Sequence, residues 1–240
     1  MIDECLQLLC EYEGRLPSKV SDDDLDTRSS VIALRRAFEF GQETLLGMRL
    51  LMDAGRLPIL ACTLCRPFYE LSYRCLWASR TPSGWLRMMR YYVEEDKSWA
   101  KAAKTVPDLM EIAESRLEED AELLCGLRVE PMPRPFNTIL RMVDEKDRAA
   151  KLISPRASHA SLNYAAVYRI LCRTAHAHIA AIGPADIVEY RAHAAWAALG
   201  GVWALLQAWC HTVPKDREQQ FDSLTKRITT IMEKSAKQHA

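Results

Sequence analysis

Residues 58–79 read PILACTLCRPFYELSYRCLWAS, and apolar side chains occupy nearly every face of the helix that this stretch predicts. One apolar stripe consists of Leu60, Leu64, Phe68, Leu71 and Cys75, and a second consists of Ile59, Cys62, Tyr69, Tyr73 and Trp77. A helix that is hydrophobic on all sides belongs at the centre of a helical protein. We therefore expect the other helices to pack around residues 58–79, with a kink at Pro67, which has no backbone donor.

Two charged residues, Arg66 and Glu70, lie one turn apart within this apolar segment. An exposed pair with this spacing contributes only ~0.3–0.5 kcal/mol. Buried charges, in contrast, are costly unless they are paired and hydrogen-bonded. The pair is therefore either a structural ion pair of the core or part of a functional site.

Helical patterns continue on both sides of this segment, and no stretch has the alternation of a strand. The expected helices cover residues 2–13, about 21–54, 81–104 starting at Thr81-Pro82, 107–126, 137–152, 162–182 and 184–213. A last helix lies within residues 214–240, and we expect its Lys-rich tail to be frayed. The fold class is all-α, a multi-helix bundle.

Three prolines at 131, 133 and 135 mark a possible internal break at residues 129–136. The break is either a linker between two halves or a loop that crosses one domain. Because the helices on both sides share the same composition, we favour a single helical domain over residues 1–240.

The composition excludes several classes of protein. With 32 basic and 32 acidic residues the chain is neutral, so a nucleic-acid site would have to be local. The first residues lack the basic n-region and the cleavage site of a signal peptide, no apolar run reaches the ~20 residues that cross a membrane, and the eight cysteines are scattered. We expect a cytoplasmic protein with reduced thiols, no membrane contact and no cofactor. The lone Cys62-x-x-Cys65 favours two core cysteines over a zinc or redox site.

Residues 162–182, LNYAAVYRILCRTAHAHIAAI, combine an apolar helical stripe with a cluster of arginine and histidine. At 100° per residue one sector contains Tyr164, Tyr168, Leu171, Ala175, His178 and Ile182, and the opposite sector contains Arg169, Arg173, His176 and Ala180. One face should pack, and the other is basic and titratable.

This second face has the groups that metal-free RNA cleavage requires. A histidine titrating near neutral pH can take the proton of a 2′-hydroxyl, and arginine forks can hold the scissile phosphate. His176 is the first candidate for acid–base catalysis because it shares its face with Arg169 and Arg173. His178 is the second candidate. No two histidines have the i to i+4 spacing of a helical metal site.

The stretch Arg173-Thr174-Ala175-His176-Ala177-His178 resembles the motif of the HEPN superfamily, in which a histidine follows an arginine after four to six residues. Arg169 to His176 fits the longer spacing. The resemblance implies an HEPN-like core with additional helices, a homodimer whose protomers both contribute to the active site, and a metal-independent ribonuclease of toxin–antitoxin or antiviral defence systems. It also implies an RNA substrate and an antitoxin or other protein partner.

The chain is also similar to an uncharacterised bacterial family with two patterns. Arg66 and Glu70 match its central Arg-x-x-x-Glu helix, and Tyr168, Leu171 and His176 match its later Tyr…Leu…His helix. This resemblance implies that Arg66, Glu70 and Tyr168 support the site.

Plainer interpretations stand beside these. His176 and its arginines can form a surface patch that pairs with the acidic helix around Glu118, and His178 can be a packed histidine with one hydrogen bond. The chain can also be a non-catalytic adaptor or sensor that binds a protein partner or a nucleotide through the same cleft. Neutral net charge favours this alternative, as does Thr174, where the HEPN motif commonly has Asn.

Overall fold

The computed structural model is all-α in the residues that it describes, as the sequence predicts. These are residues 1–18, 25–53, 58–103, 129–149, 168, 171–172, 187–213 and 217–238. The helices in this part of the chain are α1 (Ile2–Glu13), α2 (Leu25–Asp53), α3 (Pro58–Ser79), α4 (Gly84–Ala103), α6 (Phe136–Ala149), α9 (Ile187–Thr212) and α10 (Arg217–Gln238).

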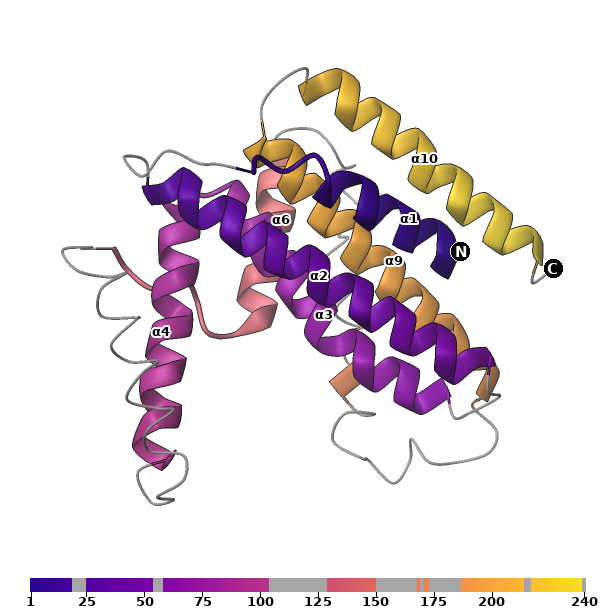
Figure 1. The fold of residues 1–240 in the computed structure, drawn as a ribbon, viewed down its shortest axis with the longest axis horizontal. Coiled ribbons are helices and arrows are strands. Elements are labelled where there is room, and N and C mark those ends of the chain that lie inside the picture. Colours follow the sequence, from indigo (N-terminus) through magenta and orange to yellow (C-terminus); the bar gives the residue numbers. More distant parts are fainter. Residues whose placement is uncertain are drawn as a thin grey trace.

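The central helix is α3, and its bounds are those predicted from its apolar composition. It packs along α9 on one side and α2 on another, and Figure 1 shows the three helices running together through the middle of the molecule. Its largest side chains, Phe68, Tyr69 and Trp77, are almost completely buried. Pro67 lies inside α3, which continues through it as one helix.

Glycines allow the three central helices to approach closely around one aromatic ring. A Cβ atom on Gly41 of α2 would lie 2.5 Å from Cε2 of Phe68, and one on Gly201 of α9 would lie 2.8 Å from Cε1 of the same ring. Phe68 is fully buried between them. Any larger residue at either position would have to displace this ring.

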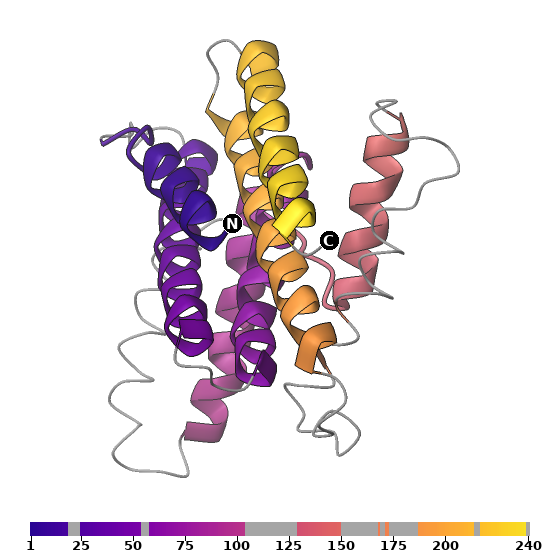
Figure 2. The ribbon, with the colours of Figure 1, turned by 90° about the vertical axis from the view of Figure 1, so that its right-hand side faces the viewer.

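The outer helices cover this core from different sides. α1 lies along α2 and α9, and its Tyr12 ring meets Trp209 edge-on at a centroid distance of 4.9 Å. α10 lies over α9, whereas α6 stands on another side of the core, as Figure 2 shows. α6 packs against α3, and its buried side chains are Phe136, Ile139, Leu140 and Val143, with Phe136 meeting the Tyr69 and Tyr73 rings of α3.

The predicted helix start at residue 81 is wrong by three residues, because α4 begins at Gly84. Thr81 is used to close α3 instead, since its hydroxyl donates to the carbonyl of Trp77 at 2.8 Å. Ser83 then has a positive φ of 50°, and the next residue touches the backbone of Ala78 so closely that only glycine fits.

Other predicted boundaries lie close to the observed ones. α6 begins one residue before the predicted Asn137, and α10 remains helical to Gln238 within the tail that we expected to fray. The predicted helix at 107–126 and most of 162–182 lie outside the described residues. Among the described helices, none combines the length and apolar character that crossing a membrane requires.

Candidate functional site

The carboxylate of Glu70 on α3 is the centre of a half-buried polar cluster beside the core. Its Oε1 accepts hydrogen bonds from Arg66 Nε at 3.0 Å and from the Tyr168 hydroxyl at 2.9 Å. Its Oε2 lies 3.9 Å from Nη2 of Arg74, the next turn of α3. One carboxylate therefore joins two arginines of α3 to a tyrosine that lies 98 positions later in the chain.

Aromatic rings hold these charged groups in place. Tyr168 is 9% exposed, and its ring packs against that of Phe136, the first residue of α6, at a centroid distance of 4.7 Å. The Arg66 guanidinium lies 5.7 Å from the centre of the Tyr168 ring, and that of Arg74 lies 4.7 Å from the Tyr91 ring of α4. The cluster thus connects α3, α4 and α6 to Tyr168.

The chemistry of this cluster is that of positioning. Burial, followed by the charge of Glu70, raises the pKa of Tyr168. The hydroxyl therefore stays protonated and donates a hydrogen bond to the carboxylate. Burial is the largest single effect and lowers the pKa of Arg66, but the hydrogen bond to Glu70 and the electrostatic effects of Cys172, Tyr168 and Glu70 together outweigh it, so the pKa is raised. Because Glu70 accepts bonds from both groups, it is placed to orient them and is poorly placed to act as a free general base.

The structure therefore brings together the three predicted supporting residues, Arg66, Glu70 and Tyr168. Leu171 is completely buried, and Tyr168 nearly so, which agrees with the predicted packing stripe. Cys172 is half-buried one turn after Tyr168 and interacts with its side chain. The predicted catalytic residues Arg169, Arg173, His176 and His178 lie outside the described residues.

A second polar cluster, which we did not predict, surrounds Arg80 directly after α3. Arg80 Nε donates to His211 Nε2 at 3.0 Å, Nη1 donates to Asp147, and Nη2 donates to Gln207. Its side chain is only 6% exposed. The sequence did contain one signal, since Gln207 and His211 interrupt an otherwise apolar stretch of α9.

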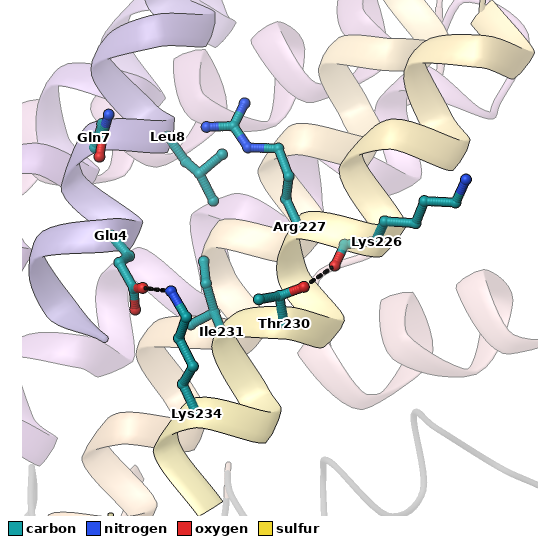
Figure 3. Close-up of a pocket in the computed structure, with 8 residues that line it drawn as sticks. All are labelled: Glu4, Gln7, Leu8, Lys226, Arg227, Thr230, Ile231 and Lys234. Atoms are coloured by element: carbon teal, nitrogen blue, oxygen red, sulfur yellow. Dashed lines mark hydrogen bonds and ion pairs between the residues drawn. The ribbon is translucent and has the colours of Figure 1, made fainter.

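A groove of about 290 Å³ separates α1 from α10, and Figure 3 shows the residues that line it. Leu8 and Ile231 form its apolar part. Lys234 reaches across to Glu4 at 2.9 Å, and Arg227 pairs with Glu11 of α1 at 2.8 Å. These two ion pairs bridge α10 and α1 across the groove and engage two of its three cationic side chains, the third being Lys226.

The described residues hold no cluster of three or more metal-ligating side chains. Cys62 and Cys65 are buried and form no disulfide, as predicted for core cysteines, and burial raises the pKa of Cys62 to about 12. No family model, no curated protein and no solved structure matches this chain.

Proposed function

We propose that this chain is a metal-independent, HEPN-like ribonuclease that acts as a toxin or phage-defence effector. The observation that supports this most is the hydrogen bond between Tyr168 and Glu70. It links the Arg66–Glu70 pair of α3 to the start of the second motif, in which His176 follows Tyr168 by eight residues. A fixed Tyr168 would set the direction in which the catalytic side chains leave the core.

In this proposal His176 acts as the acid–base group, with His178 as the second candidate. His176 takes the proton of a 2′-hydroxyl while the 2′ oxygen forms a bond to phosphorus. The bond from phosphorus to the 5′ oxygen breaks, and that oxygen takes up a proton. Arg169 and Arg173 hold the phosphate and stabilise its developing charge. The products are a 2′,3′-cyclic phosphate and a 5′-hydroxyl.

The assembly that we propose is a homodimer in which both protomers contribute to the cleft. An antitoxin or another protein partner would bind the dimer and control it. Arg66, Glu70 and Tyr168 would then support the site from within each protomer, because they link α3 to the catalytic segment.

The test is cleavage of a single-stranded RNA in the presence of EDTA, with detection of 2′,3′-cyclic phosphate ends. The His176→Ala/His178→Ala double variant should be slower by ~10²–10⁴-fold, the usual contribution of a general acid or base. His193→Ala, on α9, is the matched histidine control and should cleave like the wild type. Cleavage that survives the double substitution would exclude this mechanism.

A non-catalytic adaptor is the second candidate, and an exposed apolar face favours it. Leu46 and Leu50 of α2 are 48% and 70% exposed, and Leu60 and Leu64 of α3 are 46% and 41% exposed. Leu64 lies next to Gly47, in the turn of α2 that carries Leu46 and Leu50, so exposed leucines of α2 and α3 are neighbours there. Contiguous exposed leucines are typical of protein-binding surfaces. An adaptor would show no RNA cleavage in EDTA, and Leu50→Glu/Leu64→Glu would abolish capture of its partner.

A further inference from the structure

The Arg80 guanidinium is the point at which three helices meet. It follows the last residue of α3 and is bonded to Asp147 near the end of α6 and to Gln207 and His211 near the end of α9. Lys146 of α6 adds hydrogen bonds to the Arg80 carbonyl and, at 2.8 Å, to the Thr81 hydroxyl. Through Lys146 and Asp147, these contacts attach α6 to the end of α3 and, by way of Arg80, to α9.

We propose that His211, Arg80 and Asp147 form an acid-sensitive latch, which holds α6 on α3 and α9 while His211 is neutral and loosens when His211 takes up a proton. The latch is independent of the proposed ribonuclease function. It depends on the hydrogen bond between Arg80 Nε and His211 Nε2.

The direction of the Arg80–His211 hydrogen bond is fixed by chemistry. A guanidinium has five N–H donors and no acceptor, so the His211 nitrogen 3.0 Å from Arg80 Nε must present a lone pair. Protonation would replace this lone pair with an N–H that points at another N–H. Arg80 would lose an acceptor in a site where its side chain is 6% exposed, and two cations would be in contact.

The charges around His211 act in both directions on its protonation. Asp147 favours a protonated His211, but its carboxylate is bonded to Arg80 Nη1. Gln207 is neutral. Lys146 adds positive charge, and its own pKa is lowered by burial and then by the charges of Arg80 and Arg87. Arg80 and Lys146 therefore place two cations at this end of α3, where the Asp147 carboxylate is already bonded to Arg80, and a third cation at His211 would add to their repulsion.

Loosening of the latch would be felt at the other end of α6. Phe136 begins this helix and packs on Tyr168, with ring centroids 4.7 Å apart, and it also meets the Tyr69 and Tyr73 rings of α3. With its last turns released, α6 would depend on this aromatic contact and its apolar face alone. The latch thus links protonation near the end of α9 to the packing of Tyr168.

The test is amide hydrogen exchange of the full chain between pH 7.5 and 5.0, corrected for the intrinsic effect of pH on exchange. In the wild type, exchange of α6 should become about tenfold faster, the equivalent of one lost hydrogen bond, as the pH falls from about 6.5, the ordinary pKa of a histidine, towards 5.0, because Arg80 opposes protonation of His211; α2 should stay constant. His211→Gln keeps an oxygen that can accept from Arg80 but cannot titrate, so its α6 should not respond. His193→Gln is the matched control and should respond like the wild type.

Three results would overturn the latch. One is an α6 in the wild type that does not respond to pH, and another is an equal response in His211→Gln. The third is an α6 that is already open at pH 7.5 in His211→Gln, because a neutral acceptor should suffice. Asp147→Asn supplies a second variant, in which loss of the counter-charge should move the midpoint to lower pH. An unchanged or higher midpoint in this variant would contradict the role of His211.

Discussion

Removing the Tyr168 hydroxyl with Tyr168→Phe should weaken the Glu70 cluster without changing its packing. The hydroxyl donates to Glu70 at 2.9 Å, and the ring that Phe would keep packs on Phe136. A hydrogen bond to a charged group contributes about 1.5–3 kcal/mol. Since the Glu70 side chain is 22% exposed, solvent can replace part of the bond. We expect a loss near the lower limit, about 1.5 kcal/mol.

A double-mutant cycle with Glu70→Ala isolates this bond from other effects of each substitution. Glu70→Ala alone should cost more, about 2–4 kcal/mol, because it leaves Arg66 and Arg74 without their shared carboxylate. The two losses should not add, and the coupling energy should be about 1 kcal/mol or more.

The assay is urea denaturation followed by tryptophan fluorescence and far-ultraviolet circular dichroism, whose transitions should coincide if unfolding is two-state. The control cycle pairs Tyr168→Phe with Glu11→Ala, which removes the Arg227 partner on the α1–α10 side. The control should be additive within ~0.5 kcal/mol. A Tyr168–Glu70 coupling energy no larger than this control would refute the central position of Glu70.

Three further predictions concern packing, pH and thiol reactivity. Gly201→Ala should destabilise the protein by about 1–3 kcal/mol, because its Cβ would overlap Phe68. Gly47→Ala, which faces the exposed Leu64, should be neutral or stabilising by up to ~1 kcal/mol. Chemical denaturation of both variants tests this difference. The hydrogen bond from Lys234 lowers the pKa of Glu4 from 4.5. The contribution of this hydrogen bond to the packing of α10 is therefore fully present above pH 4.5 and is lost as the pH falls through the lower pKa of Glu4 in the folded protein. Glu4→Gln should thus make the amide exchange of α10 less sensitive to acid below pH 4.5. Cys10 is exposed, whereas burial raises the pKa of Cys5, Cys62 and Cys75 to about 12. In a thiol titration of the native protein, Cys10→Ser should therefore remove one fast-reacting equivalent, and Cys62→Ser should remove none.

Local patterns were sufficient for the features that lie within one helix. The apolar composition of residues 58–79 predicts both the bounds and the central place of α3. The i to i+4 spacing of Arg66 and Glu70 predicts their ion pair, because both side chains leave the same face. The stripe through Tyr168 and Leu171 likewise predicts their burial.

Features that join distant segments could not be derived in this way. Arg80 contacts Asp147, Gln207 and His211 across 67 to 131 positions of the chain, so no local spacing connects them. The start of α4 was misplaced for a similar reason. Thr81 and Pro82 have the local form of a helix start, but contact between Gly84 and the Ala78 backbone, together with the bond from Lys146 to Thr81, sets the turn.

The most direct measurement of the link between the Glu70 cluster and the proposed activity is the single-turnover rate of RNA cleavage, in EDTA, by Tyr168→Phe relative to wild type. The measurement uses a temperature at which both proteins are fully folded. If Tyr168 orients the segment that carries His176, the wild type cleaves RNA and loss of the hydroxyl slows cleavage by on the order of 10-fold or more, since small misplacements of catalytic groups cost up to ~10²-fold. A folded wild type that leaves RNA intact would contradict the proposed cleavage, and equal rates for the two proteins would contradict the role of Tyr168 in orienting the segment that carries His176.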